Sequence, residues 1–138
     1  KVKNGFFYFN SDLVYDIKML RSLIDCQHSN GVIGTSNLKY SNDMFKLRLR
    51  SSRVTNMCKE LNNSDGIAIG PLKFDALSSN IIFEYLETEI TKNNNKNMWC
   101  YTLFSNVLEK INLHLVEIGD SKWFEIDTLE DYKNYLDS

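Results

Sequence analysis

The chain has few cysteines, and their arrangement excludes a disulfide framework and a zinc site. Its 138 residues include three cysteines, Cys26, Cys58 and Cys100, which are widely separated and odd in number. They form no C-x-x-C pair, and His28 near Cys26 has no second pair of ligands to join it. Scattered free cysteines are typical of a reducing compartment, so we expect a cytoplasmic protein.

The sequence also lacks long apolar runs and a strong charge of either sign. No stretch approaches the roughly 18 apolar residues that a membrane span needs, and no signal peptide is visible, so no membrane partner is expected. The net charge of −2 does not indicate the positively charged surface that nucleic-acid binding requires. The basic residues at 46–53 alternate with apolar ones, which favours a solvated strand face. We therefore expect no nucleic-acid partner.

What the sequence does contain fits one globular domain over residues 1–138. Hydrophobic residues make up 43% and charged residues 25%, and the length is sufficient to bury one core. The chain begins without methionine and runs almost directly into the apolar segment 6–9. That beginning is typical of a fragment of a longer protein.

Short apolar segments alternate with amphipathic ones in the first half of the chain. The aromatic run 6–9 predicts a fully buried strand, as in a parallel sheet. Asp16 can cap a helix whose apolar residues 17, 20, 23 and 24 have helical spacing, and residues 32–33 begin another buried strand. The alternation in 45–50 and the return over 54–61 predict an antiparallel hairpin.

The second half continues with a strand and three helical patterns. Residues 66–74 predict a strand that bends or bulges where Gly70-Pro71 interrupts it. The segment 76–90 predicts a helix that buries Ile81, Ile82, Tyr85, Leu86 and Ile90. After the polar loop 92–97 we expect a helix around 103–111, a strand over 113–118, an extended piece over 123–126 and a last helix that opens at 127–128.

The predicted order of elements indicates an α/β fold. It reads β-α-β, an antiparallel hairpin, then β-α-α-β-β-α. Because helices alternate with short apolar strands, we expect a mostly parallel, Rossmann-like sheet with helices on both faces and the hairpin as an insertion.

Two acidic sites follow strand ends that are far apart in the sequence. Asp12 comes after the run 6–9, where open α/β sheets place their ligands. The stretch 125–132 (E-I-D-T-L-E-D-Y) is a strand end followed by a helix start, with Asp127 or Thr128 as the N-cap. Taken alone, each site is more simply a turn or a cap. As a pair, Asp12 and Asp127 would supply the hard oxygen ligands that Mg²⁺ prefers.

Three stretches resemble the sugar-nucleotide and phosphocholine nucleotidyltransferases, in that family's order and approximate spacing. Residues 10–12 (N-S-D) look like the mid-domain metal aspartate of the family. Residues 54–74 resemble its segment of strand, lysine, acidic spacer and glycine-containing strand. Residues 123–132 (W-F-E-I-D-T-L-E-D-Y) are similar to its closing motif, in which the aspartate of E-I-D is the second metal ligand. The small cytidylyltransferases that act on phosphocholine and related phosphate esters are the most similar.

The resemblance implies a Mg²⁺-dependent transferase. It would move a nucleoside monophosphate from a nucleoside triphosphate (CTP, or of the UTP and dTTP type) to a phosphate ester or sugar 1-phosphate and release pyrophosphate. The expected partners are therefore a nucleoside triphosphate and a small phosphorylated acceptor. Asp12 and Asp127 are the implied metal ligands and, with Lys59, the implied catalytic residues. Catalysis of this kind rests on positioning and electrostatics.

The resemblance also implies substrate-binding residues. Lys59 matches the lysine that contacts substrate phosphate, although a solvated strand residue is an equal alternative. Gly70 matches a glycine that lets the backbone approach the substrate, and a kink beside Pro71 explains it almost as well. The closing motif adds Trp123 and Glu125.

The aromatic residues Trp99, Tyr101 and Trp123 raise the question of a choline-binding cage. Phosphocholine-type relatives usually carry an acidic residue close to these aromatics, and residues 99–102 (W-C-Y-T) have none. The sequence therefore favours buried packing of the three rings over a site for a quaternary ammonium group.

One element of the family is missing from the sequence. No stretch resembles the Gly-rich loop with a basic residue that cradles the triphosphate, because residues 31–34 (G-V-I-G) lack its length and its basic residue. The resemblance thus covers the second half of the nucleotidyltransferase domain, and the N-terminal nucleotide-binding part is absent. We expect a partial enzyme whose isolated chain is inactive. The alternatives are a short non-catalytic binding module of this family, or a generic α/β interaction domain with a chance E-I-D-T match.

Overall fold

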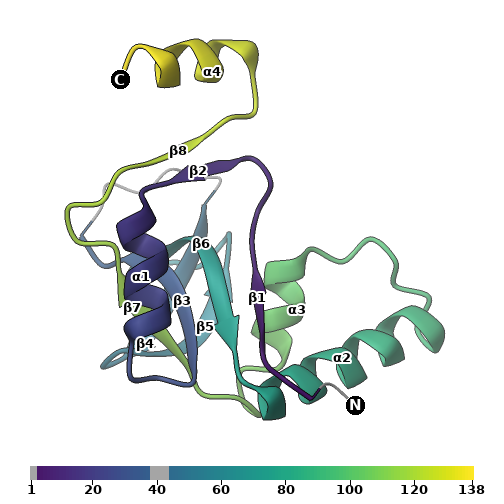
Figure 1. Cartoon of the computed structure of the whole chain (residues 1–138). Coiled ribbons are helices and arrows are strands. Elements are labelled where there is room, and N and C mark those ends of the chain that lie inside the picture. The colour runs from purple at the N-terminus through teal and green to yellow at the C-terminus, as the bar shows by residue number, and fades with distance from the viewer. Residues whose placement is uncertain (1–2, 38–43) are drawn as a thin grey trace.

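The structure is a computed structural model that describes residues 3–37 and 44–138. Within these ranges the chain forms eight strands and four helices (Figure 1). In chain order they are β1 (Phe6–Tyr8), β2 (Leu13–Tyr15), α1 (Ile17–Asp25), β3 (Asn30–Thr35), β4 (Phe45–Arg50), β5 (Arg53–Cys58), β6 (Gly66–Phe74), α2 (Ala76–Thr91), α3 (Cys100–Asn106), β7 (Leu113–Glu117), β8 (Trp123–Glu125) and α4 (Leu129–Leu136).

The main sheet is mixed, and the expectation of a mostly parallel sheet is wrong. Among the described residues its six strands have the order β1-β6-β3-β7-β5-β4, and β4 also pairs with β6. Strands β1, β3, β4 and β7 run in one direction, but the antiparallel strand β6 lies between β1 and β3, and β5 lies between β7 and β4. In the described part of the chain, the pairing of β3 with β7 is consequently the one parallel pairing.

The strand β1 is an edge strand, which corrects the prediction that residues 6–9 are fully buried. It pairs antiparallel with β6, from Phe6 opposite Phe74 to Tyr8 opposite Leu72. Phe6 and Tyr8 pack against the core, whereas Phe7 is 45% exposed. The aromatic run therefore alternates between a covered face and an open one.

Local signals in the sequence set the starts of the helices as expected. The Asp16 carboxylate accepts a hydrogen bond from the Lys18 amide at 2.9 Å and caps α1. Thr128 caps α4 and forms a capping box with Asp131. The hairpin of β4 and β5 is confirmed, with Ser51 at a φ of 55° in its turn.

The predicted irregularity at Gly70-Pro71 is confirmed within an otherwise continuous strand. Val32 of β3 lies opposite Leu72 of β6, but Gly34 lies opposite Ala68. Residues 69–71 are thus accommodated opposite a single residue of β3, which is a bulge.

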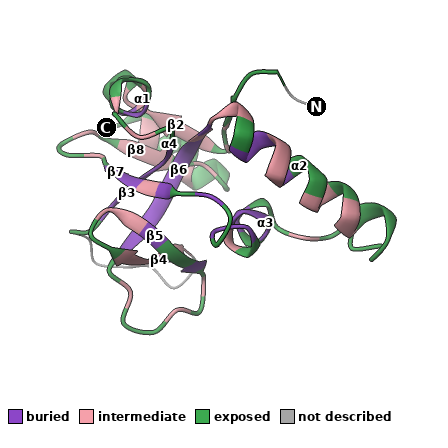
Figure 2. Cartoon of the chain, turned by 90° about the horizontal axis from the view of Figure 1, so that it is seen from below, coloured by how far each residue is buried: buried purple, intermediate pink, exposed green. Residues whose placement is uncertain are grey.

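Helices cover both faces of the sheet, as predicted. On one face α1 buries Met19 and Leu23 against strand residues that include Ile33, and on the other face α3 packs with α2 over a larger cluster. The buried residues follow the sheet and the inner sides of these helices (Figure 2). The core is therefore split by the sheet into two layers.

Two helices differ from the sequence prediction at their ends. In α2, Ile82 is buried, whereas Ile90 is 41% exposed because the second half of the helix extends past the sheet (Figure 2). The helix α3 ends at Asn106, and the apolar residues after it, including Val107 and Ile111, are buried in a turn.

The helix α4 lies at one end of the molecule (Figure 1), where its Tyr135 ring contacts the Phe124 ring of β8 at 5.3 Å between centroids. None of its residues 129–136 is buried, and Leu129 and Leu136 are 70% and 62% exposed. Throughout the described ranges, no helix combines the length and the apolar composition that crossing a membrane requires.

Candidate functional site

Three carboxylates from opposite ends of the chain converge at one point. Asp12 lies in the turn before β2, Glu125 ends β8 and Asp127 follows it. The strands β2 and β8 pair antiparallel with Leu13 opposite Glu125, and the Ile126 amide donates to the Asp12 carbonyl at 2.8 Å. One oxygen of each carboxylate then lies within 4.8 Å of the other two. The structure therefore brings together the two aspartates predicted from the sequence and adds Glu125 to them.

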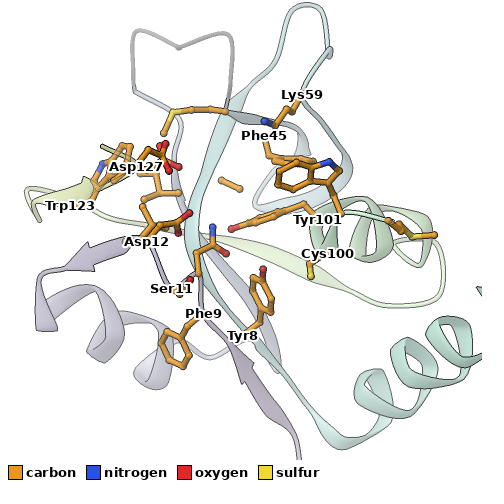
Figure 3. A pocket seen from close by; sticks show the side chains of 18 of the residues that line it. Tyr8, Phe9, Ser11, Asp12, Phe45, Lys59, Cys100, Tyr101, Trp123 and Asp127 are labelled. Carbon is orange, nitrogen blue, oxygen red and sulfur yellow. The ribbon is translucent and has the colours of Figure 1, made fainter. Parts of the chain in front are cut away.

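The capping box of α4 leaves the Asp127 carboxylate available. Asp131 Oδ2 accepts hydrogen bonds from the Thr128 amide at 2.8 Å and from Thr128 Oγ1 at 2.7 Å. These bonds, first of all those from Thr128, lower the pKa of the Asp131 carboxyl. Capping is thus performed by Thr128 and Asp131, and the Asp127 side chain points towards Asp12 instead (Figure 3).

The carboxylates form one wall of a cleft of about 970 Å³. Lys59 and the aromatic side chains of Phe45 and Tyr101 lie on the opposite side (Figure 3). The lining contains the predicted residues Asp12, Lys59, Trp123, Glu125 and Asp127, together with Tyr8–Ser11, Leu13, Met44, Phe45, Ala68, Ile69 and Lys96–Tyr101.

The lysine across the cleft is held by aromatic rings. Lys59 Nζ lies 5.2 Å from the centroid of the Trp99 ring and 5.7 Å from that of Phe45. Among the described residues, the single ion pair within 4.0 Å is that of Arg48 with Asp65, so Lys59 has no carboxylate partner there. The ammonium group is therefore available for an anionic ligand.

Gly70 lies outside the lining of the cleft. A Cβ atom at this position would come within 2.8 Å of Tyr15 Cε1 and 3.1 Å of Leu13 Cδ1. The Gly70 carbonyl accepts a hydrogen bond from the Tyr101 hydroxyl at 3.3 Å. The close approach that this glycine permits is thus made by the chain's own β2.

The electrostatic environment of Glu125 favours its protonated form. Burial raises the pKa of the Glu125 carboxyl, and the negative charges of Asp127 and Asp12 raise it further. Lys59 acts in the opposite direction. A cation bound between the carboxylates would remove this repulsion, so the cluster is suited to a metal ion.

Two tyrosines that the sequence did not single out lie at or beside the site: Tyr8 lines the cleft, and Tyr15 supports the turn that carries Asp12. The Tyr15 hydroxyl donates to the Asn10 carbonyl at 3.3 Å and ties β2 to the turn that carries Asp12. Burial, with a smaller contribution from Asp12, raises the pKa of Tyr15 to about 12. Burial likewise raises the pKa of Tyr8. Both phenols are therefore held further from ionisation than a free tyrosine.

The aromatic residues have different environments. Tyr101 is 6% exposed, so its predicted burial is confirmed, and its ring stacks on that of Phe45 at 4.7 Å between centroids. Trp99 is 68% exposed, so the prediction that its ring is buried is wrong. Its position at the N-cap of α3, directly after the polar loop, leaves most of the ring in solvent.

The three carboxylates form a group that could hold a divalent metal ion. Octahedral coordination at about 2.1 Å places cis oxygens about 3 Å apart and trans oxygens about 4.2 Å apart. The oxygen separations between Asp12, Glu125 and Asp127, up to 4.8 Å, would have to shorten by a few tenths of an ångström to match the trans distance. Hard carboxylate ligands and solvent access match the preference of Mg²⁺ for a few carboxylates plus water or phosphate.

Comparison with known proteins supports the fold through structure alone. No family model matches the chain, and no curated protein sequence matches it. The inositol-1-phosphate CTP transferase from T. maritima matches with a TM-score of 0.70 at 15% identity over 97% of this chain and 54% of that one. The CTP:phosphocholine cytidylyltransferase from Streptococcus pneumoniae matches with a TM-score of 0.71 at 13% identity, over 95% and 56%. A putative glucose-1-phosphate thymidylyltransferase from Bacillus anthracis gives 0.69 at 11%, over 95% and 52%.

These similar structures are all nucleotidyltransferases, and the chain spans about half the length of each. The family resemblance seen in the sequence is thus confirmed at the level of the fold. The chain has the fold of the nucleotidyltransferases over about half of their length.

Proposed function

We propose that the cleft is the metal-binding and acceptor-binding side of a nucleotidyltransferase active site. In this reaction a phosphate oxygen of the acceptor attacks the α-phosphorus of a nucleoside triphosphate. A new P–O bond forms, the bond to the β-phosphate breaks, and pyrophosphate leaves. The observation that carries the proposal is the convergence of Asp12, Glu125 and Asp127 opposite Lys59, in one cleft of a nucleotidyltransferase fold.

Asp12 and Asp127, with Glu125 beside them, are the residues that would hold Mg²⁺. The ion supplies charge neutralisation and orientation of the phosphate groups when it is bound. The pairing of β2 with β8 fixes the backbone that carries these carboxylates, which supports a site that needs little rearrangement to bind the ion.

Lys59 provides the positive charge on the acceptor side. A compact ammonium group pairs with a phosphate dianion as a point charge, and the cleft places it across from the carboxylates. The second pKa of a phosphate monoester is about 6, so the acceptor is already ionised at neutral pH. The chain therefore needs to position the acceptor and does not need to deprotonate it.

The nucleoside triphosphate requires a binding element that the chain does not show. The similar structures are about twice as long, and no Gly-rich basic loop is present in the sequence. Within the described residues the outer edge of β1 is unpaired, and Phe7 and Phe9 beside it are 45% and 47% exposed. An open aromatic edge is normally paired or covered. In our proposal, a second structural unit that binds the triphosphate docks along β1.

Metal binding by the chain tests the proposal without requiring activity. Mn²⁺ is titrated into the protein and the free ion is measured by electron paramagnetic resonance. We expect D127N to weaken binding by at least about tenfold, because even loss of a residue that only supports a metal ligand costs about 10–100-fold. D120N is the matched control, since Asp120 is an exposed acid in a nearby turn. Equal binding by wild type and D127N would refute the metal role.

A transfer assay separates catalysis from mere binding. The protein that contains both the chain and the triphosphate-binding unit is given CTP or UTP and a phosphate ester, and pyrophosphate is measured. Pyrophosphate release that depends on Asp127 supports the enzyme. Nucleotide binding by the unmodified protein without any release of pyrophosphate would identify a non-catalytic module.

A further inference from the structure

The Lys59 ammonium group lies over the rings of both Phe45 and Trp99 in the cleft, and we call the space beside these two rings the aromatic slot. Phe45 is the first residue of β4, Lys59 follows β5 and Trp99 caps α3, so three separate elements bring these side chains together. The distances of 5.2 Å and 5.7 Å from Lys59 Nζ to the two ring centroids are within the range of cation–π interactions. The close-up shows the Lys59 ammonium beside the Phe45 ring (Figure 3).

The slot is a built feature and not a chance contact of one exposed lysine. Tyr101 stacks on Phe45 with an interplanar angle of 22°, and Tyr101 is itself fixed by its hydrogen bond to Gly70. The position of the Phe45 ring is thus set from the core. Trp99 has most of its surface exposed, yet its ring lies by the Lys59 ammonium.

An empty slot between aromatic rings is the kind of site that binds a quaternary ammonium ligand. We propose that Lys59 fills it as an internal plug, and that the cleft therefore selects phosphate esters without a cationic group and rejects ammonium-bearing acceptors. The selection among acceptors rests on the function proposed above. The presence of Lys59 in the slot is independent of that function.

Charge and space act in the same direction. A ligand cation that entered between Phe45 and Trp99 would have to displace the Lys59 side chain and would meet its charge at close range. No carboxylate lies within 4.0 Å of Lys59 in the described part of the chain, and the three carboxylates of the cleft lie on its opposite side. An anionic phosphate, in contrast, meets an attractive charge at the same place.

The slot is tested with tetramethylammonium chloride as the probe. All proteins carry W123F, which leaves Trp99 as the one tryptophan of the chain, and its fluorescence is recorded at constant ionic strength. With Lys59 present we expect no saturable change. In K59A the empty slot should bind the probe at least roughly tenfold more tightly than the protein that retains Lys59. K59M is the matched control, because its thioether refills the slot without charge and should keep the probe out.

Saturation transfer from protein to the probe's methyl protons gives a second readout that needs no tryptophan. Signal in K59A that disappears in the double variant K59A/W99A assigns binding to the slot. K96A removes a different lysine of the cleft and should behave like wild type. Binding of the probe by wild type as tightly as by K59A, no binding by a folded K59A, or equal binding by K59M and K59A would each overturn the proposal. None of these results depends on metal binding or transfer, which test the proposed function separately.

Discussion

Replacement of Glu125 by glutamine should stabilise the metal-free protein and reduce the stabilisation that a divalent metal gives. The Glu125 carboxylate lies within 4.8 Å of both Asp12 and Asp127, measured between one oxygen of each. In the absence of metal, E125Q removes a charge that its neighbours repel. In the presence of metal, it removes a ligand. We therefore expect the variant to be more stable than wild type without Mg²⁺ and to gain less from Mg²⁺.

The magnitude follows from Coulomb's law. Two unit charges 4.8 Å apart repel by about 0.9 kcal/mol at the dielectric constant of water, which is the appropriate limit for solvent-accessible groups. With two neighbouring aspartates, E125Q should raise the free energy of unfolding by roughly 1–2 kcal/mol at neutral pH and low salt. Mg²⁺ at 100 times its dissociation constant stabilises wild type by about 2.7 kcal/mol. If E125Q binds Mg²⁺ tenfold more weakly, it gains about 1.4 kcal/mol at the same concentration, so saturating Mg²⁺ should remove most of its advantage over wild type.

The pH dependence has a defined sign. Burial, Asp127 and Asp12 raise the pKa of Glu125 in the folded protein. Between the unfolded and the folded pKa the folded state binds more protons, so stability is highest below the unfolded pKa and falls as the pH rises through the folded one. E125Q should remove this fall. Mg²⁺ should remove it as well, because it favours the ionised carboxylate.

Urea denaturation at pH 5 and pH 7, with and without MgCl₂ at constant ionic strength, measures all of these effects. E109Q is the control, since Glu109 is an exposed acid outside the cluster. The reasoning is refuted if E125Q is less stable than wild type without metal, or if Mg²⁺ stabilises both proteins equally.

Three further predictions concern the scaffold of the site. G70A should lower the free energy of unfolding by about 1–3 kcal/mol in urea denaturation, because the added methyl would contact Tyr15 at 2.8 Å; an unchanged midpoint would contradict the described packing of β2. T128A should cost α4 about 1 kcal/mol, seen as faster amide hydrogen exchange in that helix alone. Burial and the neighbouring His28 lower the pKa of His114, so the free energy of unfolding should fall as the pH falls below about 6.5. H114Q should flatten this dependence of the urea midpoint on pH, and an unchanged dependence would contradict the prediction.

Elements whose signals are local were predictable from the sequence. The Asp16 cap, the alternation of residues 45–50 and the interruption at Gly70-Pro71 each depend on neighbouring residues, and the structure shows α1, the β4–β5 hairpin and the β6 bulge where they were expected. The direction of strand pairing is not local. Helices alternate with strands whether β6 runs parallel or antiparallel to β3, so the pattern did not reveal the mixed sheet.

The candidate site was only partly predictable for the same reason. Asp12 and Asp127 followed from the resemblance of the stretches around them. The pairing of β2 with β8, which brings them together, was missed. The strand β2 spans only residues 13–15, which is too short to show the alternation of a strand. Glu125 was expected at the substrate, and its place in the carboxylate cluster depends on the register of β8 against β2.

The position of a bound divalent ion tests the account most directly. Crystals of the chain are soaked in MnCl₂, and an anomalous difference map is calculated at a wavelength where manganese scatters anomalously. We predict a peak bounded by carboxylate oxygens of Asp12, Glu125 and Asp127, on the side of the cleft that faces Lys59. A chain that binds Mn²⁺ in solution but shows its peak at other residues would contradict the central claim.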